Sequence, residues 1–68
     1  MSNHIYQIIQ LTGSSTVSSD DAIQQAITKA SQTSEHVRWF EVVETRGHVE
    51  QGKVAHWQVT IKVGQTLD

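Results

Sequence analysis

The feature that most limits this chain is its short length combined with the absence of cysteine: it has 68 residues and no Cys. A domain of this size buries only about 60% of the surface that its unfolded chain exposes, so its stability is marginal. Small proteins usually add disulfides, metal ions or partner chains. Without cysteine, neither a disulfide nor a thiolate metal site can form. We therefore expect one domain over residues 1–68 that gains burial by associating with other chains.

The charged residues argue against nucleic acid and membranes as partners. Five Lys and Arg stand against seven Asp and Glu, for a formal net charge of −2, and the basic residues form no stripe that could follow a phosphate backbone. No apolar run approaches the roughly 18 residues of a membrane span. The first residues show no signal-peptide pattern. We expect a soluble, cytoplasmic protein.

The N-terminal half of the sequence predicts a strand followed by a helix. His4–Leu11 is rich in Ile, which is typical of a strand, and the segment from Gly13 is predicted to be a loop. Ser18 and Asp21 have the spacing of a capping box, which marks a helix start. The apolar residues behind them recur at helical spacing, and many are alanine, so the helix must lie close against the sheet that it covers. They are Ala22, Ile23, Ala26, Ile27 and Ala30.

The C-terminal half predicts two strands joined by a tight turn. Val37–Arg46 and Lys53–Leu67 are the strands, and Gln51-Gly52 is the turn, where glycine supplies the positive φ that such turns require. The predicted fold is therefore of the α+β class, a β-α-β-β chain in which one helix partly wraps a three-stranded antiparallel sheet. In the last strand apolar and polar residues alternate. The apolar ones, predicted to face the core, are Ala55, Trp57, Val59, Ile61, Val63 and Leu67.

The turn also predicts how these two strands pair. If Glu50 faces Lys53, the residue numbers of every further pair add up to 103. This places Phe40 opposite Val63, and likewise Val42 opposite Ile61, on the core face, and only a β-bulge would shift the pairing. On the other face of the sheet, which we call the reverse face, the predicted pairs are Trp39 with Gly64, Glu41 with Lys62, Val43 with Thr60, and Thr45 with Gln58.

The predicted reverse face is not a simple solvated surface. A large indole beside Gly64 leaves a flat slot in which a planar ring could stack on Trp39. The amide of Gln58 offers two donors and an acceptor, which suits the polar edge of such a ring. The alternative is that Trp39 packs in an interface between copies of the chain, as tryptophan often does. The periodicity of the strand leaves both interpretations open.

The histidines do not predict a metal site. His48 and His56 flank the turn but are predicted to point to opposite faces, and His4 and His36 lie at the edges of segments. No pair has the spacing of ligands on one helix face. We expect no bound metal.

The sequence does not predict a catalytic centre either. Cysteine is absent and no serine occupies a nucleophile elbow. Glu41 and Glu44 lie three positions apart on a strand, so they are predicted to point to opposite faces and cannot form a facing acid–base pair. We expect that the protein is not an enzyme.

Several segments occur in an order that is similar to one known family. They are His4-Ile5-Tyr6, Leu11-Thr12-Gly13-Ser14-Ser15, Asp21-Ala22-Ile23, Arg38-Trp39-Phe40-Glu41-Val42-Val43-Glu44, Arg46-Gly47, Gly52-Lys53-Val54-Ala55-His56-Trp57-Gln58-Val59-Thr60 and Lys62-Val63-Gly64. Along nearly its whole length the chain resembles the bacterial type of dodecin, a family of small flavin-binding proteins.

The resemblance implies a cofactor and an assembly. By its resemblance to dodecins, the chain is expected to be a β-α-β-β protomer of a hollow homododecamer. Flavins would then bind in pairs between its subunits. By this resemblance Trp39 stacks on the flavin ring, Gln58 bonds its pyrimidine edge, and Arg46 favours a phosphorylated flavin. FMN is then the expected cofactor, with riboflavin as an alternative. Gln65 and Thr66 stand where family members often have Phe and Arg, which argues against coenzyme A as a second ligand.

These implications favour one function over two others. The first is storage or sequestration of flavin, with quenching of its photochemistry by the stacked indole. The second is a structural oligomeric cage with no physiological role for flavin. The third and weakest is a flavoenzyme.

Overall fold

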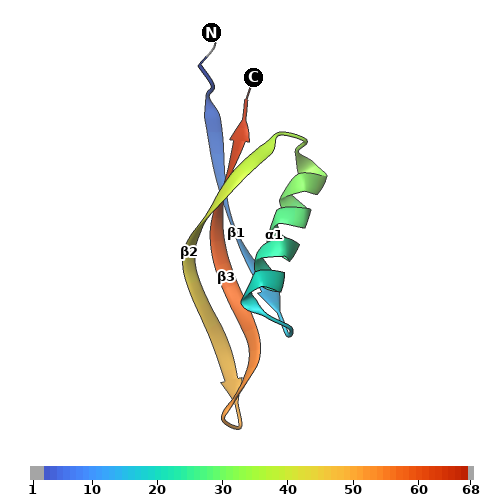
Figure 1. The fold of residues 1–68 in the computed structure, drawn as a ribbon, viewed down its shortest axis with the longest axis vertical. Helices are drawn as coiled ribbons and strands as arrows, with labels where there is room; N and C mark the ends of the chain where they lie inside the picture. The colour runs from blue at the N-terminus through green and yellow to red at the C-terminus, as the bar shows by residue number, and fades with distance from the viewer. Residues whose placement is uncertain (1–2, 68) are drawn as a thin grey trace.

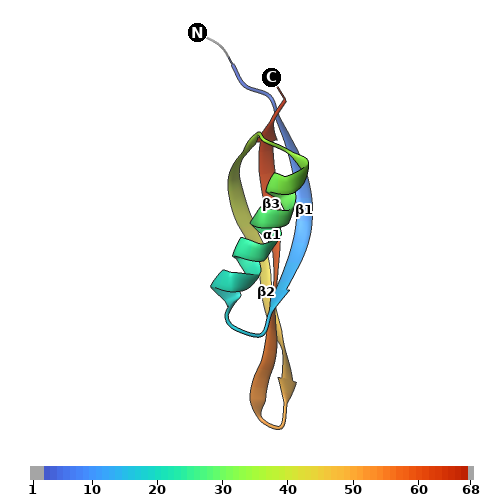
Figure 2. The ribbon, with the colours of Figure 1, turned by 90° about the vertical axis from the view of Figure 1, so that its right-hand side faces the viewer.

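The computed structural model describes residues 3–67 and contains one helix and three strands. β1 spans Tyr6–Ser15, α1 spans Ser19–Thr33, β2 spans Val37–Glu50 and β3 spans Lys53–Thr66. The strands form one sheet in the order β1-β3-β2, in which β3 is antiparallel to both neighbours, and α1 lies on one face of it (Figure 1, Figure 2). The predicted β-α-β-β fold is confirmed. β1 and β2 are the two edge strands, joined through α1, with β3 between them.

The first two strands are longer than predicted. β2 runs to Glu50 instead of Arg46, and β1 passes through Gly13 and ends at Ser15. The segment after Gly13 is strand, not loop, because it continues to pair with β3 as far as Ser15, opposite Trp57. α1 packs directly against the sheet at Gly13. A Cβ atom on Gly13 would lie 2.1 Å from the backbone oxygen of Ala22. The glycine therefore gives the helix room to approach β1.

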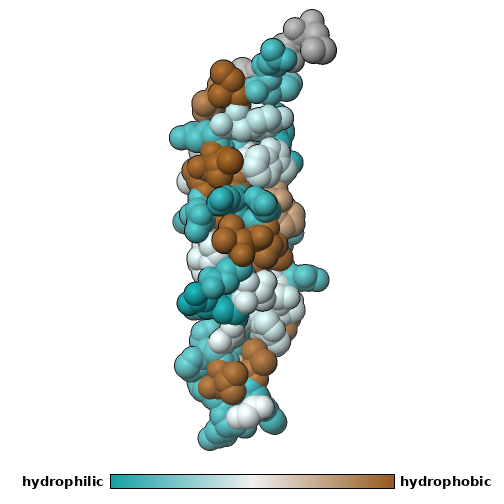
Figure 3. All heavy atoms as spheres, turned by 90° about the vertical axis from the view of Figure 1, so that its left-hand side faces the viewer, coloured by the Kyte–Doolittle hydropathy of each residue, from teal (hydrophilic) through white to brown (hydrophobic). Residues whose placement is uncertain are grey.

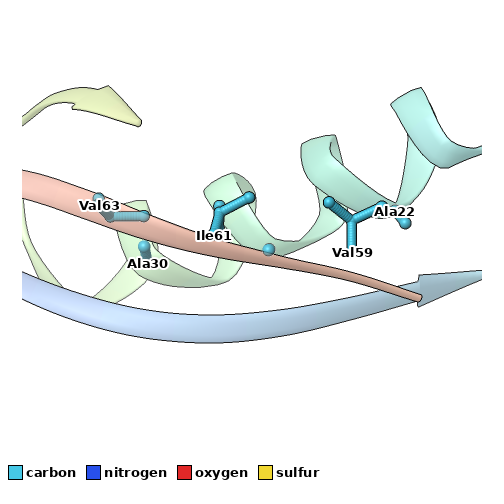
Figure 4. Close-up of a cluster of buried hydrophobic side chains, with 6 residues drawn as sticks. Ala22, Ala30, Val59, Ile61 and Val63 are labelled. Atoms are coloured by element: carbon cyan, nitrogen blue, oxygen red, sulfur yellow. The ribbon is translucent and has the colours of Figure 1, made fainter. Parts of the chain in front are cut away.

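The core lies between α1 and β3 and is small. The alanine side chains of α1 face the centre of the sheet, as their spacing predicted, and allow the helix to lie close to it (Figure 4). Ile23 and Ile27 pack beside them and are partly buried. Within residues 3–67 no helix is long and apolar enough to cross a membrane. The buried hydrophobic residues are Ala22, Ala26, Ala30, Val59, Ile61 and Val63.

Much of the sheet is left uncovered by the helix. The chain measures 55 × 20 × 14 Å and has a radius of gyration of 14.1 Å, whereas a compact domain of this length has about 11 Å. α1 packs mainly on β1 and β3. Phe40 and Val42 of β2 were predicted to belong to the core, but they are 47% and 45% exposed, since α1 does not reach over that strand. Leu67, also predicted to face the core, is exposed.

The start of α1 is tied to the end of β1 by side-chain hydrogen bonds. The Ser18 hydroxyl accepts a bond from the backbone N–H of Asp21 at 3.0 Å, which confirms the predicted cap. The Asp21 carboxylate accepts bonds from the Ser15 hydroxyl at 2.6 Å and from the Gln25 amide at 2.7 Å. These two bonds lower the pKa of Asp21, and the bond from Ser15 has the larger effect.

We expect the pKa of Asp21 in the folded protein to lie below its ordinary value of 3.8 and to rise in Ser15→Ala. A depressed pKa in the folded state means that the carboxylate stabilises the fold above pH 3.8, and that this contribution is lost as the pH falls through the folded-state pKa. An NMR titration of the carboxyl carbon measures it. Gln24→Ala is the control, because the Gln24 amide bonds Thr28 instead. An unchanged pKa in Ser15→Ala would contradict this prediction.

Candidate ligand site on the uncovered face of the sheet

The reverse face of the sheet carries all three residues predicted to bind a ligand. On β3, Val59 and Val63 are buried under α1, so their neighbours Gln58 and Gly64 point to the other face. Trp39 lies opposite Gly64 and Arg46 lies opposite Gln58. Apolar groups alternate with polar ones along this face (Figure 3).

A β-bulge at Val43 decides which residues of β2 reach the reverse face. From Trp39 to Val42 the predicted pairing is confirmed: Trp39 faces Gly64 and Glu41 faces Lys62. At the start of β2 it is not, because the register also shifts between Val37 and Trp39 and Val37 lies opposite Gln65. After the bulge at Val43, Glu44 lies opposite Thr60 and Arg46 lies opposite Gln58, so the predicted pairs of Val43 with Thr60 and Thr45 with Gln58 are wrong. The extra residue shifts the pairing by one position, which turns each following side chain to the other face.

A second irregularity near the turn restores the predicted pairing. His48 lies opposite His56, but the next pair is Val49 with Val54, so Ala55 is an extra residue on β3. Beyond this point Glu50 faces Lys53, as predicted, and the turn residues Gln51 and Gly52 have φ values of 52° and 76°. Two positive φ values are the mark of a type I′ turn.

The indole of Trp39 lies directly over Gly64. A Cβ atom on Gly64 would lie 2.1 Å from Cε2 and 2.3 Å from Cζ2 of the indole. The predicted slot beside the ring is therefore occupied by the ring itself. Tyr6 of β1 meets the indole edge-on, with ring centroids 6.1 Å apart and an interplanar angle of 64°. Trp39 remains 37% exposed, so part of a fixed aromatic surface is open to a planar ligand.

Arg46 has a partner that the sequence did not reveal. Its Nη2 donates to both carboxylate oxygens of Glu44 at 2.9 Å, and the two side chains are 63% and 49% exposed. Residues two apart on a strand share a face, so both belong to the reverse face. Arg46, Glu44 and Gln58 thus form one polar group on two neighbouring strands. Only the bulge at Val43 creates it, and no sequence signal marks that bulge.

One chain does not bring Trp39 and Gln58 together. Trp39 lies over Gly64, which is six positions from Gln58 along β3. At about 3.3 Å per residue the two ends of the site are about 20 Å apart. A ring stacked on Trp39 cannot reach Gln58 of the same chain. If both residues bind one ligand, they belong to different copies.

Two further predictions about this face are wrong for the same reason. His48 and His56 do not point to opposite faces; they are cross-strand neighbours, with rings stacked 5.3 Å apart at an angle of 15°. Glu41 and Glu44 also share the reverse face, because the bulge lies between them. Among residues 3–67 there is no group of three or more His, Asp or Glu side chains that could hold a metal ion.

Comparisons with known proteins agree on one family. The family model Dodecin matches residues 5–68. A dodecin from Thermus thermophilus is 38% identical over 64 residues, which are 94% of this chain and 93% of that protein. The structure of dodecin from Streptomyces davaonensis has 51% identity and a TM-score of 0.91 over 98% of each chain. Dodecin from Streptomyces coelicolor has 47% identity and a TM-score of 0.92, covering 100% of this chain and 97% of that one.

We expect Gly64→Ala to displace the indole of Trp39, because the added Cβ would overlap the ring. In a Trp57→Phe background, which leaves Trp39 as the only tryptophan, the fluorescence emission should shift to the red as the ring becomes more exposed. Gln24→Ala in the same background is the control, since it changes an exposed residue of α1, which lies on the other face of the sheet. Equal emission in the glycine variant and its parent would show that the indole does not lie on Gly64.

Proposed function

This chain belongs to the dodecin family, and from that premise we propose that it binds flavin, above all FMN, between the subunits of a hollow homododecamer. The assembly stores or sequesters the flavin, and electron transfer from the stacked indole quenches its excited state and limits its photochemistry. We place the protein in the cytoplasm, with flavin and its own copies as its partners.

The observation that carries this proposal is the fixed, partly exposed indole of Trp39. It is held between the backbone at Gly64 and the edge of Tyr6. Stacking of a planar ligand on such a surface contributes about 1–3 kcal/mol per ring in comparable sites. Little conformational entropy is lost on binding, because the indole is already held in place.

The separation of the site residues supports binding between subunits. A flavin stacked on Trp39 lies too far from Gln58 of the same chain to bond with it. The amide of Gln58 can accept from the N–H and donate to a carbonyl of the pyrimidine edge, so a neighbouring copy supplies this contact. Arg46 of that copy, directly opposite Gln58, then lies on the same surface and supplies positive charge for a phosphate.

The distribution of apolar side chains supports self-association. Only six hydrophobic residues of the described chain are buried, and three of them are alanine. Large apolar side chains are exposed on both faces of the sheet, and two edge strands are open to pairing. Burial of these groups against further copies would supply the stability that a chain of this length lacks. The number of twelve copies comes from the family.

We propose a binding protein and not an enzyme. The bulge brings Glu41 and Glu44 to one face, but the carboxylate of Glu44 is engaged by Arg46 and Glu41 lies opposite Lys62. The second candidate function is a structural cage without flavin, which the exposed apolar side chains alone would also support. In that case Trp39 serves only as an interface anchor.

We expect Trp39→Ala to weaken flavin binding at least about fivefold, since each flavin loses its stacking surface. Isothermal titration with flavin measures the affinity, because its signal does not depend on quenching by the indole that the variant removes. Trp57→Phe is the matched control, because it removes the other indole. Trp57 lies on the same face of the sheet as α1, paired with Ser15 of β1 and Gly47 of β2. The flavin affinity of this variant should stay within about threefold of the parent, because an aromatic ring is kept in the same packing.

Sedimentation of the same proteins tests the assembly. The parent and both variants should sediment as one large oligomer at micromolar concentration. A stable monomer would contradict self-association, and unchanged flavin affinity in Trp39→Ala would favour the structural cage.

We expect Gln58→Leu and Arg46→Ala to differ in their effects on the two flavins. Gln58→Leu leaves polar groups of the shared ring unpaired, at about 1–3 kcal/mol, so riboflavin and FMN should lose affinity equally. Arg46→Ala should weaken FMN selectively, and added salt should reduce the FMN preference of the parent. Isothermal titration of both ligands measures this. An equal loss of riboflavin and FMN affinity in Arg46→Ala would contradict phosphate recognition by this arginine.

A further inference from the structure

The ion pair between Arg46 and Glu44 bears on which flavin the site prefers. We propose that Glu44 is a specificity-determining residue: by holding the guanidinium of Arg46 it limits the preference for FMN over riboflavin. This inference rests on the proposed function, because it concerns the ligand of the same site. It adds a residue that opposes the contribution of Arg46.

The geometry of the pair shows how Glu44 competes with a phosphate. Both carboxylate oxygens accept from one nitrogen, Nη2 of Arg46, at 2.9 Å. A phosphate that approaches this guanidinium either displaces the carboxylate from Nη2 or binds the remaining N–H groups beside a negative charge. Both routes cost free energy that an unpaired arginine would not require. The two side chains are 63% and 49% exposed, so a ligand can reach them.

The charge of the local surface leads to the same conclusion. On the neighbouring strand β3, the neutral amide of Gln58 lies opposite Arg46, and the hydroxyl of Thr60 lies opposite Glu44. The charges of Arg46 and Glu44 therefore cancel within this group, which leaves a polar surface with little net charge. Such a surface favours an anionic ligand over riboflavin less strongly than an unpaired arginine would. Without the carboxylate the guanidinium would act as a full positive charge.

The chain offers a matched control in Glu41. It lies on the same strand and the same face as Glu44, opposite Lys62, but it does not bond Arg46. Replacing either residue by Gln removes one negative charge from the reverse face. A difference between the two variants therefore reports contact with Arg46 and not the net charge of the protein.

The test compares the ratio of FMN affinity to riboflavin affinity in the full-length parent, Glu44→Gln and Glu41→Gln, by isothermal titration at low salt. Glutamine keeps the size of the side chain and one oxygen that can accept from Arg46, so the arginine stays in place. We expect the ratio to rise about twofold to fivefold in Glu44→Gln, the range for an exposed ion pair. In Glu41→Gln it should change less than twofold, and salt should reduce the gain in Glu44→Gln.

A double variant separates an effect through Arg46 from direct repulsion. In an Arg46→Ala background, Glu44→Gln should change the ratio by less than twofold, because the guanidinium that Glu44 holds is gone. A full gain in that background would overturn the proposal, since Glu44 would then repel the phosphate directly. A lower ratio in Glu44→Gln would also overturn it, because Glu44 would then position Arg46 for the phosphate.

The same titrations distinguish an error in the role of Glu44 from an error in the proposed function. If the parent binds both flavins and Arg46→Ala weakens only FMN, an unchanged ratio in Glu44→Gln overturns the role of Glu44 alone. If the parent binds neither flavin, the proposed function and this inference fall together.

Discussion

The extra residue at Val43 turns the side chains that follow it in β2 to the opposite face of the sheet. The composition of the reverse face depends on this bulge. Without this bulge Glu44 and Arg46 would face the side of α1, and Thr45 would lie opposite Gln58. With it, a charged pair stands beside the Gln58 amide. The second irregularity, at Ala55, returns the strands to a pairing that the tight turn can close. The shifted segment lies between these two irregularities.

The small core explains why the reverse face is available for binding at all. α1 approaches the sheet closely through alanine side chains and over Gly13, but a single helix covers only part of one face. Apolar groups such as Phe40 and Val42 therefore stay exposed in the single chain. The same shortage of burial leaves a broad surface uncovered in the single chain, and in the proposed function further copies and the flavin cover it.

The two ends of the reverse face offer different kinds of interaction. At one end the indole of Trp39, fixed over Gly64, provides an apolar stacking surface. At the other end Gln58 and the pair of Arg46 with Glu44 provide hydrogen bonds and a balanced charge. Because about 20 Å separates them, one ligand can use both only where two chains meet. In the proposed function, recognition of the flavin ring and of its substituents would therefore fall to different subunits.

The sequence by itself determined the local structure and the family. The positive φ at Gly52 required a tight turn, the spacing of alanines and the Ser18 cap specified the helix, and the alternation in β3 identified its buried face. The sequence also singled out Trp39, Gln58 and Arg46 as binding residues, a role that stays a prediction. Only the tertiary structure decided where β2 slips against β3, because Val42 and Val43 are both apolar and the hydrophobic pattern fits either pairing. The tertiary structure alone likewise set the position of the helix, which leaves Phe40 exposed, since exposure depends on packing between elements and not on the alternation within a strand.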